Sequence, residues 1–416
     1  MEKNRIDARN TLKIVEEIAI GNYKNELSYL KKLVHSITVN KNFNISSGRV
    51  WEINKNCTGY LLKYQSGKAG KLPLDTEINI NDYTEIKELV KNKVFIAEES
   101  NELLRSKGIK LFSAAGAGEY VKSNNNKRYF KYLLGFNADK MPKGFNETLS
   151  IIGNVVSLTL RNIRNSEKQH TINKELAAAG EIQHQIIPIS NVKFSDFDVY
   201  GVCHNANSVG GDYFDYFPNI NDEENRLGIV VCDAASKGLA ASIEALYVSG
   251  AIRMANYFRP RISTLLYRLN NLIFNHFPYD RFVTLFYIEL TNAANRLALY
   301  SNAGHCPAIH IKHDGNVDYL YPTSGVLGLA PDQQFNIESI TIEQDDILII
   351  YSDGITEAQN SNGELYGENK LIELVKQNTQ LTSQEIVNCV INDVEEFSNG
   401  GKYTDDKTIV VIKRQQ

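Results

Sequence analysis

Aspartate recurs beside very small side chains at points where an apolar segment of this chain ends or begins. In the stretch IVVCDAASKGLAAS, Asp233 follows a short apolar run and precedes two alanines, which leave the backbone accessible. The run is too short for a helix and does not alternate, which is typical of a strand buried on both faces. Comparable aspartates occur in SVGGDYFDYF, ILIIYSDGITEA and YTDDKTIVVIKR, as Asp212, Asp353 and the pair Asp405 and Asp406. We therefore expect several carboxylates at the ends of buried strands.

Oxygen ligands without histidine or cysteine suit magnesium or manganese better than zinc. Two such cations that share a carboxylate can hold a hydroxide for in-line attack on phosphorus. A single aspartate in such a turn has a simpler explanation, because it can cap nearby backbone amides. In the same stretch Ser236 is placed to cap the following helix, and Gly238 permits a tight turn. Because four stretches repeat the pattern, and no serine or cysteine stands in a nucleophile turn, the sequence favours a metal site.

The elements that must position these carboxylates follow from the hydrophobic pattern of residues 190–416. Helices are predicted in two pairs, at 237–258 with 261–277 and at 368–377 with 383–397. Strands are predicted at 196–205, 226–232, 281–290, 296–302, 307–312, 346–351 and 407–413. Strand runs with helices grouped in pairs, without strict β-α-β alternation, are typical of a mostly antiparallel α+β sandwich.

A single long helix is predicted at 147–187, because this stretch contains no proline before Pro188. Roughly forty residues at 1.5 Å each would span about 60 Å. The helix carries an apolar seam made of Ile152, Val156, Thr159, Ile163, Ile172, Leu176, Ala179, Gln183 and Ile186. Such a seam predicts a coiled-coil stalk between two parallel copies, and hence a homodimer. Polar residues interrupt it near the middle, so packing on the chain's own domain is the alternative.

Composition describes an ordinary globular chain of two or three domains, with 416 residues, 43% hydrophobic and 23% charged. A net charge of −4 and the lack of a basic block give no reason to expect a nucleic-acid partner. The apolar runs are too short to span a bilayer, and the charged start is unlike a signal peptide, so no membrane partner is expected. Five scattered cysteines without a CxxC pair predict reduced thiols and a cytoplasmic location.

Residues 175–416 resemble the SpoIIE-type (RsbU-like) bacterial branch of the metal-dependent protein phosphatases, which share the protein phosphatase 2C-like (PP2C-like) fold. The matching stretches, in chain order, are AAAGEIQHQIIP, SVGGDYFDYF, VVCDAASKGLAAS, VTLFYIEL, LYSNAGHCPAIHI, GVLGLA, DILIIYSDGITEAQN, LYGENKL and DDKTIVVI. The resemblance implies an αββα sandwich with two divalent cations, manganese or magnesium, at one sheet edge. It also implies hydrolysis of phosphoserine or phosphothreonine on a protein.

The resemblance assigns roles to individual residues as well. Asp233 would bridge both cations, and the backbone carbonyl of Ala234 would reach the second one. Asp353 and Asp405 would complete the shell of the first cation, and Asp212 would hold a metal-bound water. The metal ligands expected on this basis are Asp212, Asp233, Ala234, Asp353, Asp405 and Asp406, and the sequence leaves the separate roles of the last two open.

One position departs from the family pattern, because DAASKG has Ser236 where the family's DxSGKG has glycine. This departure keeps open a second function, a catalytically weak protein that binds and sequesters the same partner. A phosphohydrolase of the haloacid-dehalogenase type is disfavoured, since that family needs a DxD motif that CDAA does not supply. His305 in NAGHCP follows a glycine turn between strands, so we expect it to be structural.

The N-terminal residues 1–165 resemble a GAF sensor domain in the order of their predicted helices and strands, for an unknown signal or small ligand. Helices are expected at 11–39, a strand pair at 48–64, a helix with a strand at 84–97, and a strand at 128–136. With the linker at 147–187 and the phosphatase domain at 190–416, the chain is expected to be a sensor-controlled phosphatase. Its expected substrate is a phosphorylated STAS-domain anti-anti-sigma protein of a partner-switching pathway.

Regulation is expected to pass through the end of the long helix, where it enters the phosphatase domain. The linker residues expected to carry it are Ala179, Gly180, Gln183 and Ile186. Small residues at this point would permit close, adjustable packing, although they also fit a plain helix. A shift here would reach the metal ligands through the helix pair that begins at Lys237, and sites for hard cations tolerate little such error.

Overall fold

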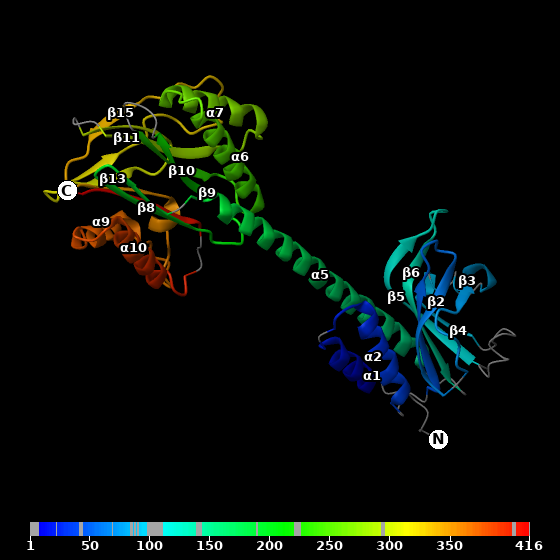
Figure 1. Ribbon diagram of the computed structural model, residues 1–416. Helices are drawn as coiled ribbons and strands as arrows, with labels where there is room; N and C mark the ends of the chain where they lie inside the picture. The colour runs from blue at the N-terminus through cyan, green and yellow to red at the C-terminus, as the bar shows by residue number, and fades with distance from the viewer. Residues whose placement is uncertain are drawn as a thin grey trace. The chain divides into compact units, whose positions relative to one another are not determined.

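The computed structural model describes residues 8–21, 23–40, 45–68, 70–83, 86, 89, 91–97, 111–138, 144–188, 190–219, 226–292, 296–401 and 405–415. The chain divides into two compact units, Met1–Ile172 and Asn173–Gln416, and each is described by itself. Helix α5 (Phe145–Ile186) belongs to both units, because the division falls within it (Figure 1). Within these described ranges, none of the helices combines the length and the apolar character that a bilayer crossing requires.

The N-terminal unit is built on a six-stranded antiparallel sheet in the order β3-β2-β1-β6-β5-β4. Its strands are β1 (Ser47–Ile53), β2 (Gly59–Gly67), β3 (Glu77–Asn79), β4 (Val94–Ala97), β5 (Leu111–Lys122) and β6 (Arg128–Ala138). Its helices are α1 (Ala8–Ala19), α2 (Glu26–Val39) and the first part of α5. The expected strand pair and the strands at β4 and β6 are confirmed, β5 was missed, and the predicted helix before β4 lies partly outside the described residues. The GAF-like assignment stays a prediction.

Different parts of the apolar seam of α5 have different surroundings. Its first half is buried in the core of the N-terminal unit, where Ile152 and Val156 are 1% and 0% exposed and pack with α2 and β6. Its last part lies in the C-terminal unit, where Gln183 is buried. Ile172, between these parts, is 49% exposed. The alternative interpretation, packing on the chain's own domains, therefore holds for much of the seam, and the homodimer stays a prediction.

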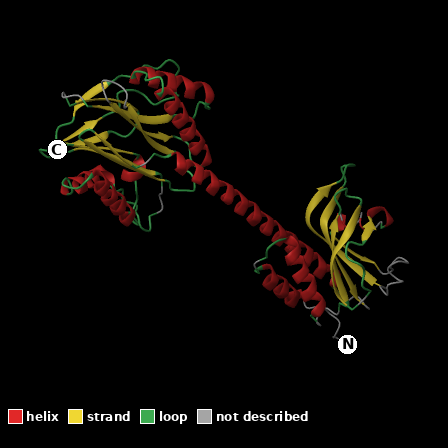
Figure 2. Cartoon of the chain, in the orientation of Figure 1, coloured by secondary structure: helices red, strands yellow, loops and turns green. Residues whose placement is uncertain are grey.

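The C-terminal unit contains two antiparallel sheets (Figure 2). The first has the order β15-β12-β11-β10-β9 and the second the order β14-β13-β16-β17-β8-β7. The strands are β7 (Asn191–Phe194), β8 (Phe197–His204), β9 (Asp212–Asn219), β10 (Arg226–Ala234), β11 (Val283–Thr291), β12 (Leu297–Ala303), β13 (Ala308–Ile311), β14 (Val317–Leu320), β15 (Glu338–Thr341), β16 (Ile347–Tyr351) and β17 (Lys407–Arg414). Each strand predicted in this region is present.

Helix pairs cover the outer faces of the two sheets, which makes a four-layer αββα sandwich. The first pair is α6 (Leu239–Asn256) with α7 (Ile262–His276), and the second is α9 (Gly367–Gln377) with α10 (Ser383–Phe397) (Figure 1). Separate apolar cores lie between the first pair and its sheet, between the two sheets, and between the second sheet and the second pair. Strands such as β10 and β16 are buried along nearly their whole length because apolar layers lie on both sides.

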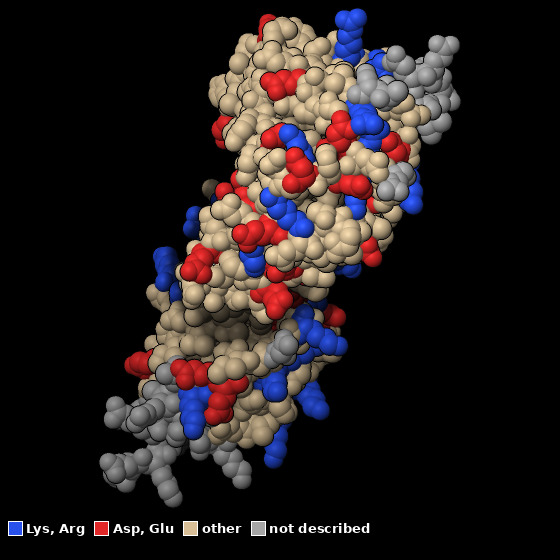
Figure 3. All heavy atoms as spheres, turned by 90° about the vertical axis from the view of Figure 1, so that its left-hand side faces the viewer, with Lys and Arg blue, Asp and Glu red and all other residues tan. Residues whose placement is uncertain are grey.

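The surface of the molecule in Figure 3 intersperses acidic and basic side chains among other residues, without one sign dominating this face. This mixture agrees with the small net charge of −4. All five cysteines are free.

Candidate metal centre

The ends of four strands bring the sequence-predicted carboxylates to one edge of the sandwich. β9 begins at Asp212, and the ladder between β9 and β10 pairs this residue with Asp233. In the other sheet, β16 ends just before Asp353, which opens the short helix α8 (Asp353–Thr356). Asp405 and Asp406 stand directly before β17, which pairs with β16. Antiparallel pairing therefore brings together the aspartates within each sheet, and the hydrogen bond from the Gly211 N–H to Asp406 joins the two groups across the sheets.

Close backbone packing fixes the Asp353 turn against the segment that carries Asp406. The backbone N–H of Ser352 donates to the Thr408 carbonyl at 2.9 Å, and the Ser352 hydroxyl donates to the Asp406 carbonyl at 3.2 Å. A Cβ atom on Gly354 would lie only 2.0 Å from the Asp406 carbonyl oxygen. Only glycine therefore permits this approach, which explains the DG pair of the sequence.

Asp212 and Asp233 are neighbouring carboxyl groups whose ionised forms repel each other. Asp212 is 3% exposed, and its Oδ2 has no hydrogen-bond partner in the described part of the chain. Burial, together with the neighbouring Asp233, raises the pKa of Asp212 well above its usual range. Burial and the charges of Asp353, Asp405 and Asp406 raise the pKa of Asp233 to about 7. Such mutual repulsion is what a bound cation would relieve.

The remaining carboxylates differ in their partners. Asp353 has a pKa raised by burial and by the nearby Glu357 and Asp405. The Oδ2 atom of Asp405 lies 3.3 Å from the Nζ atom of Lys237, whose side chain is largely exposed, so this ion pair is weak. Asp406 instead accepts two backbone N–H groups. The sequence could not separate these two adjacent aspartates, whereas their contacts do.

Asp406 holds the loop that leads into Asp212. The N–H of Ala206 donates to its Oδ1 at 2.8 Å, and the N–H of Gly211 donates to its Oδ2 at 2.6 Å. Gly211 also contacts the residue that follows Asp233, because its carbonyl accepts the N–H of Ala234 at 3.3 Å. Asp406 is thus a link between the two sheets at this edge.

These residues fit a divalent cation by their chemistry, although they do not form a compact ligand set as they stand. Among the described residues, no three His, Cys, Asp or Glu side chains are close enough together to hold an ion. The orphaned oxygen of Asp212 and the raised pKa of Asp233 are the observations that favour a cation here. An all-oxygen donor set fits magnesium or manganese.

Ser236 does not cap helix α6, contrary to the prediction from sequence. The N-cap is Gly238, with φ of 63° and no side-chain cap hydrogen bond. The Ser236 hydroxyl instead donates to Oε1 of Glu244 at 3.0 Å, and the same oxygen accepts from Nη1 of Arg281 at 2.7 Å. Sequence reasoning missed this group, because Arg281 lies 37 residues after Glu244 and no spacing rule connects it with Ser236 and Glu244.

The end of α5 is bound to the loop before Asp212. Gln183 is 3% exposed; its Nε2 donates to the Gly210 carbonyl at 2.7 Å, and its Oε1 accepts the Gly210 N–H at 3.0 Å. A Cβ atom on Gly180 would lie 1.9 Å from the carbonyl oxygen of Ser208, so glycine is required at this contact. The carbonyl of Ile186 accepts from Nη2 of Arg253, near the end of α6.

Of the four linker residues expected from sequence, three therefore make specific contacts within the C-terminal unit. The fourth residue, Ala179, is half-buried, and its methyl side chain cannot form a hydrogen bond. Arg253 also donates to Oδ2 of the buried Asp215 at 2.6 Å, so the helix end, α6 and β9 are joined.

His305 is structural in its contacts, as expected. It is 3% exposed, its backbone N–H donates to Oδ1 of Asn302 at 2.8 Å, and its Nδ1 lies 2.9 Å from the Thr284 hydroxyl oxygen. Burial lowers the pKa of His305 to about 4, so the imidazole is neutral at physiological pH. Thr284 is the ladder partner of Asp233, so His305 supports the metal edge from within the sheet.

Comparisons with known sequences concern the part of the chain that carries these residues. Residues 223–415 match the family described as stage II sporulation protein E (SpoIIE). The chain is 27% identical over 267 residues to the protein IcfG of Synechocystis, covering 58% of this chain and 41% of IcfG. It is 24% identical over 258 residues to the phosphoserine phosphatase RsbU of Bacillus subtilis, covering 62% of this chain and 73% of RsbU. The chain thus spans less than half the length of one relative and about three quarters of the other.

The fold has a match among solved structures as well. The SiaA-PP2C domain of Pseudomonas aeruginosa superposes with a TM-score of 0.51 at 15% identity, covering 59% of this chain and 98% of that domain. This likeness concerns the fold, and it agrees with the αββα layers described above. Residues 223–415 of the C-terminal unit therefore match a SpoIIE-type phosphatase domain, and the layers of this unit are those of the PP2C-like fold.

Proposed function

We propose that this chain is a metal-dependent phosphatase that removes phosphate from serine or threonine of a regulatory protein. The observation that carries the proposal is the pair of the buried Asp212 and the half-buried Asp233, whose raised pKa values, together with the orphaned Oδ2 of Asp212, favour a cation at this edge. The family of the domain and the all-oxygen donor set support the same reading. Two divalent cations, manganese or magnesium, are proposed as cofactors.

Asp233 and the Ala234 carbonyl are proposed to hold the cations from β10, with Asp353 and Asp405 from the second sheet and Asp212 from β9. Bound divalent cations supply an activated water and neutralise the charge of a phosphate group. Asp405 is the better candidate ligand of the two adjacent aspartates, because its Oδ1 accepts one backbone N–H and its Oδ2 pairs with a largely exposed lysine, whereas both oxygens of Asp406 accept backbone N–H groups. We propose that Asp406 positions Asp212 by holding its loop.

The finer assignments rest on the same resemblance and remain proposals. RsbU is named a phosphoserine phosphatase, and on this basis a phosphorylated STAS-domain anti-anti-sigma protein is the proposed substrate. We also propose that the N-terminal unit senses a signal or small ligand, and that the chain is a cytoplasmic homodimer. The alternative, a catalytically weak sequestering protein, was motivated by Ser236, but this side chain has well-placed partners and does not disturb the carboxylates.

We propose that control passes from the N-terminal unit through the last turns of α5. Support comes from Gln183, which binds both polar groups of the Gly210 backbone, two residues before Asp212. A change in the position of the helix end would move this loop and with it one proposed metal ligand. Arg253 offers a second route, since it joins Ile186 to α6.

The test is phosphate release from a phosphorylated STAS-domain protein by the purified full chain. Manganese should be required, and Asp233→Asn should remove nearly all turnover, because one carboxylate serves both ions. An unrelated phosphoserine peptide serves as the control for substrate choice. Phosphate release that persists after thorough chelation would contradict the metal mechanism. Tight binding of the phosphoprotein without phosphate release would favour the sequestering protein instead.

A further inference from the structure

We propose that Ser236, Glu244 and Arg281 form a positioning relay that fixes the metal loop, defined here as residues 233–237, to helix α6 and to the start of β11. The inference rests on the proposed function, because the loop carries Asp233 and Ala234. Neither Ser236 nor Glu244 would touch a cation or a substrate. Their role is to set where the loop places its two ligands.

The geometry of the relay centres on a buried carboxylate. Glu244 lies in the second turn of α6 and is 2% exposed. Its Oε1 accepts both the Ser236 hydroxyl at 3.0 Å and Nη1 of Arg281 at 2.7 Å. Its Oε2 is buried without a hydrogen-bond partner among the described residues. The carboxylate is therefore held through one oxygen by two neighbours from two other elements.

A buried carboxylate in this position requires an explanation, because an apolar residue would complete the α6 core without a desolvation penalty. Its neighbours on the helix, Ala241, Ala245 and Val248, belong to the apolar core under α6. Glu244 is thus placed where the sequence pattern favours an apolar side chain. What the acid adds is a tie from a rigid helix to Ser236, two residues after the Ala234 carbonyl.

The loop is attached to the start of β11 by backbone as well. The N–H of Ala235 donates to the Phe282 carbonyl at 3.0 Å, next to Arg281 in the chain. Arg281 is therefore held near the loop independently of its ion pair. Together, the backbone bond and the relay attach the loop to α6 and to the residues directly before β11, while Lys237 at the end of the loop approaches Asp405. Such support is how ligand positions are kept within the small tolerance of hard-cation sites.

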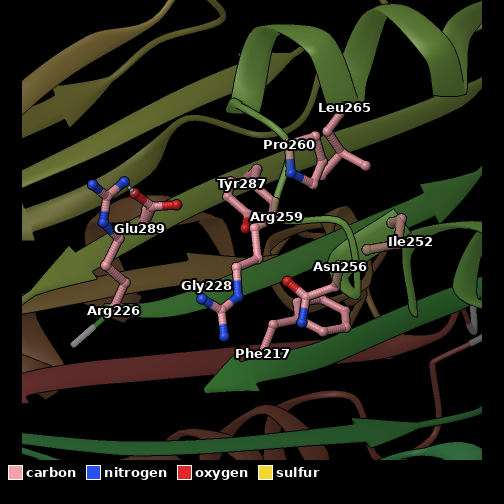
Figure 4. A pocket seen from close by; sticks show the side chains of 10 residues that line it. All are labelled: Phe217, Arg226, Gly228, Ile252, Asn256, Arg259, Pro260, Leu265, Tyr287 and Glu289. Carbon is pink, nitrogen blue, oxygen red and sulfur yellow. Dashed lines mark hydrogen bonds and ion pairs between the residues drawn. The ribbon is translucent and has the colours of Figure 1, made fainter. Parts of the chain in front are cut away.

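A matched control exists at the opposite end of the same strands. Arg226 Nη1 and Glu289 Oε1 lie 2.8 Å apart, bridging β10 and β11 as an ion pair of similar length. Figure 4 shows them beside a pocket of about 190 Å³. Arg226 begins β10 whereas Asp233 lies near its end, roughly 20 Å away along the strand. Glu289→Gln should therefore perturb an arginine–glutamate pair without affecting the metal loop.

The first measurement does not depend on metal. Hydrogen exchange of the backbone amides in residues 233–237 is followed in the metal-free full chain. We expect about tenfold faster exchange in Ser236→Ala and in Glu244→Leu, and wild-type exchange in Ser236→Thr, which keeps the hydroxyl, and in Glu289→Gln. Because Ser236→Ala and Glu244→Leu remove the same link, the double variant should exchange no faster than the faster single variant.

The second measurement is calorimetric titration of the same proteins with manganese. Ser236→Ala should raise the dissociation constant for manganese about tenfold, because the lost hydrogen bond involves a charged acceptor. In a separate assay, its rate of phosphate release at saturating manganese should recover towards that of the wild type. A purely structural role would lower thermal stability without this split between metal affinity and maximal rate. Circular dichroism on each variant checks that the fold is intact.

The outcomes separate the relay from the proposed function. Wild-type exchange in Ser236→Ala and Glu244→Leu, or an equal change in Glu289→Gln, would overturn the relay even if the protein is an active phosphatase. Faster exchange confined to the two relay variants would support it even if no phosphate is released, in which case only the proposed function fails. Unchanged manganese affinity despite faster exchange would also overturn the positioning role.

Discussion

At the scale of single residues, the metal edge is a place where charge is concentrated without compensation. Asp212 and Asp233 are ladder partners with raised pKa values, and Asp212 is almost fully buried. Ionised carboxylates in such positions oppose folding in the absence of a cation. The same charges favour folding once a cation is bound, because binding to the native state stabilises it. Whether a substitution of one of these aspartates raises or lowers the stability of the fold should therefore depend on whether metal is bound.

Asp212→Asn is expected to raise the melting temperature of the metal-free full chain by about 2–5 °C, because it removes one of two repelling carboxylates. The same variant should lose most of the stabilisation that manganese gives to the wild type. Differential scanning fluorimetry with chelator and with manganese measures both effects.

Asp215 provides the control for this prediction, since it lies on the same strand and is equally buried but is paired with Arg253. Asp215→Asn should lower the melting temperature with or without metal. An Asp212→Asn protein that melts below the wild type in chelator would contradict the account of repulsion.

The pH dependence follows from the same two groups. Their pKa values are higher in the folded than in the unfolded chain, so the folded state binds protons more tightly. Without metal, stability should therefore be greatest below about pH 4 as far as these groups contribute. It should fall as the pH rises towards 7, the approximate pKa of Asp233.

With manganese the slope should reverse, because the cation competes with protons for the same oxygens. Melting temperatures between pH 4.5 and 8, in chelator and in manganese, test both slopes. Parallel curves in the two conditions would show that these carboxylates do not bind the metal.

The sequence predicted which residues meet at this edge better than what each one does. Strand-end aspartates could be found because buried apolar runs and small neighbours mark them. The difference between Asp405 and Asp406 could not, since adjacent residues share every pattern and are told apart only by the loop that approaches from 206–211. The sequence predicts a helix cap at Ser236 because capping rules consider only the residues that directly follow it. In the structure its hydroxyl binds Glu244 of α6, which also accepts from Arg281, two residues before β11.

At the scale of elements, hydrophobic pattern was most reliable where burial is complete. Strands such as β16 and β17 are buried along most of their length, and their predicted bounds agree closely with the structure. β5 was missed because LFSAAGAGEYVK is rich in alanine and glycine, which are weak strand formers. Its pairing with β6 along most of its length, rather than its own side chains, makes it a strand.

The contact between α5 and the Gly210 loop is open to a direct test. Gly180→Ala would force a Cβ against the Ser208 carbonyl, and Gln183→Leu would leave the buried polar groups of Gly210 without partners. Each should lower the melting temperature of the metal-free chain by about 2–5 °C. Each should also displace the manganese concentration for half-maximal phosphate release by at least about threefold, because this loop leads into Asp212.

Ile182→Ala is the matched control for the linker, because this residue lies between the other two on α5 and is 58% exposed. It should leave the melting temperature and the manganese concentration for half-maximal phosphate release at their wild-type values. If the manganese midpoint is the same in all three variants and the wild type, the helix end does not act on the metal centre and serves only as a tether.

At the scale of the whole molecule, the chain consists of two units that share one helix. Hydrophobic pattern could not locate the division, because a helix shows no composition change where it passes from one core to the next. The expected boundaries at 165 and 190 therefore bracket the division at Ile172 instead of matching it. The seam of α5 leaves two interpretations open for the same reason, since a four-three repeat looks the same whether it packs against a second chain or against its own domain, and the coiled-coil stalk stays a prediction.

Separate cores predict separate unfolding. The N-terminal unit has its own apolar clusters, built from α2, α5 and its sheet, and the C-terminal unit has three others. All proposed metal ligands belong to the C-terminal unit, so manganese should raise only one of two calorimetric transitions of the full chain, by RT ln(1 + [L]/Kd). Asp233→Asn should abolish that shift and leave the other transition in place. A single transition that moves as a whole would show instead that α5 couples the two cores into one cooperative structure. A change in the N-terminal unit would then reach the proposed metal ligands through folding stability as well as through the contacts of the helix end.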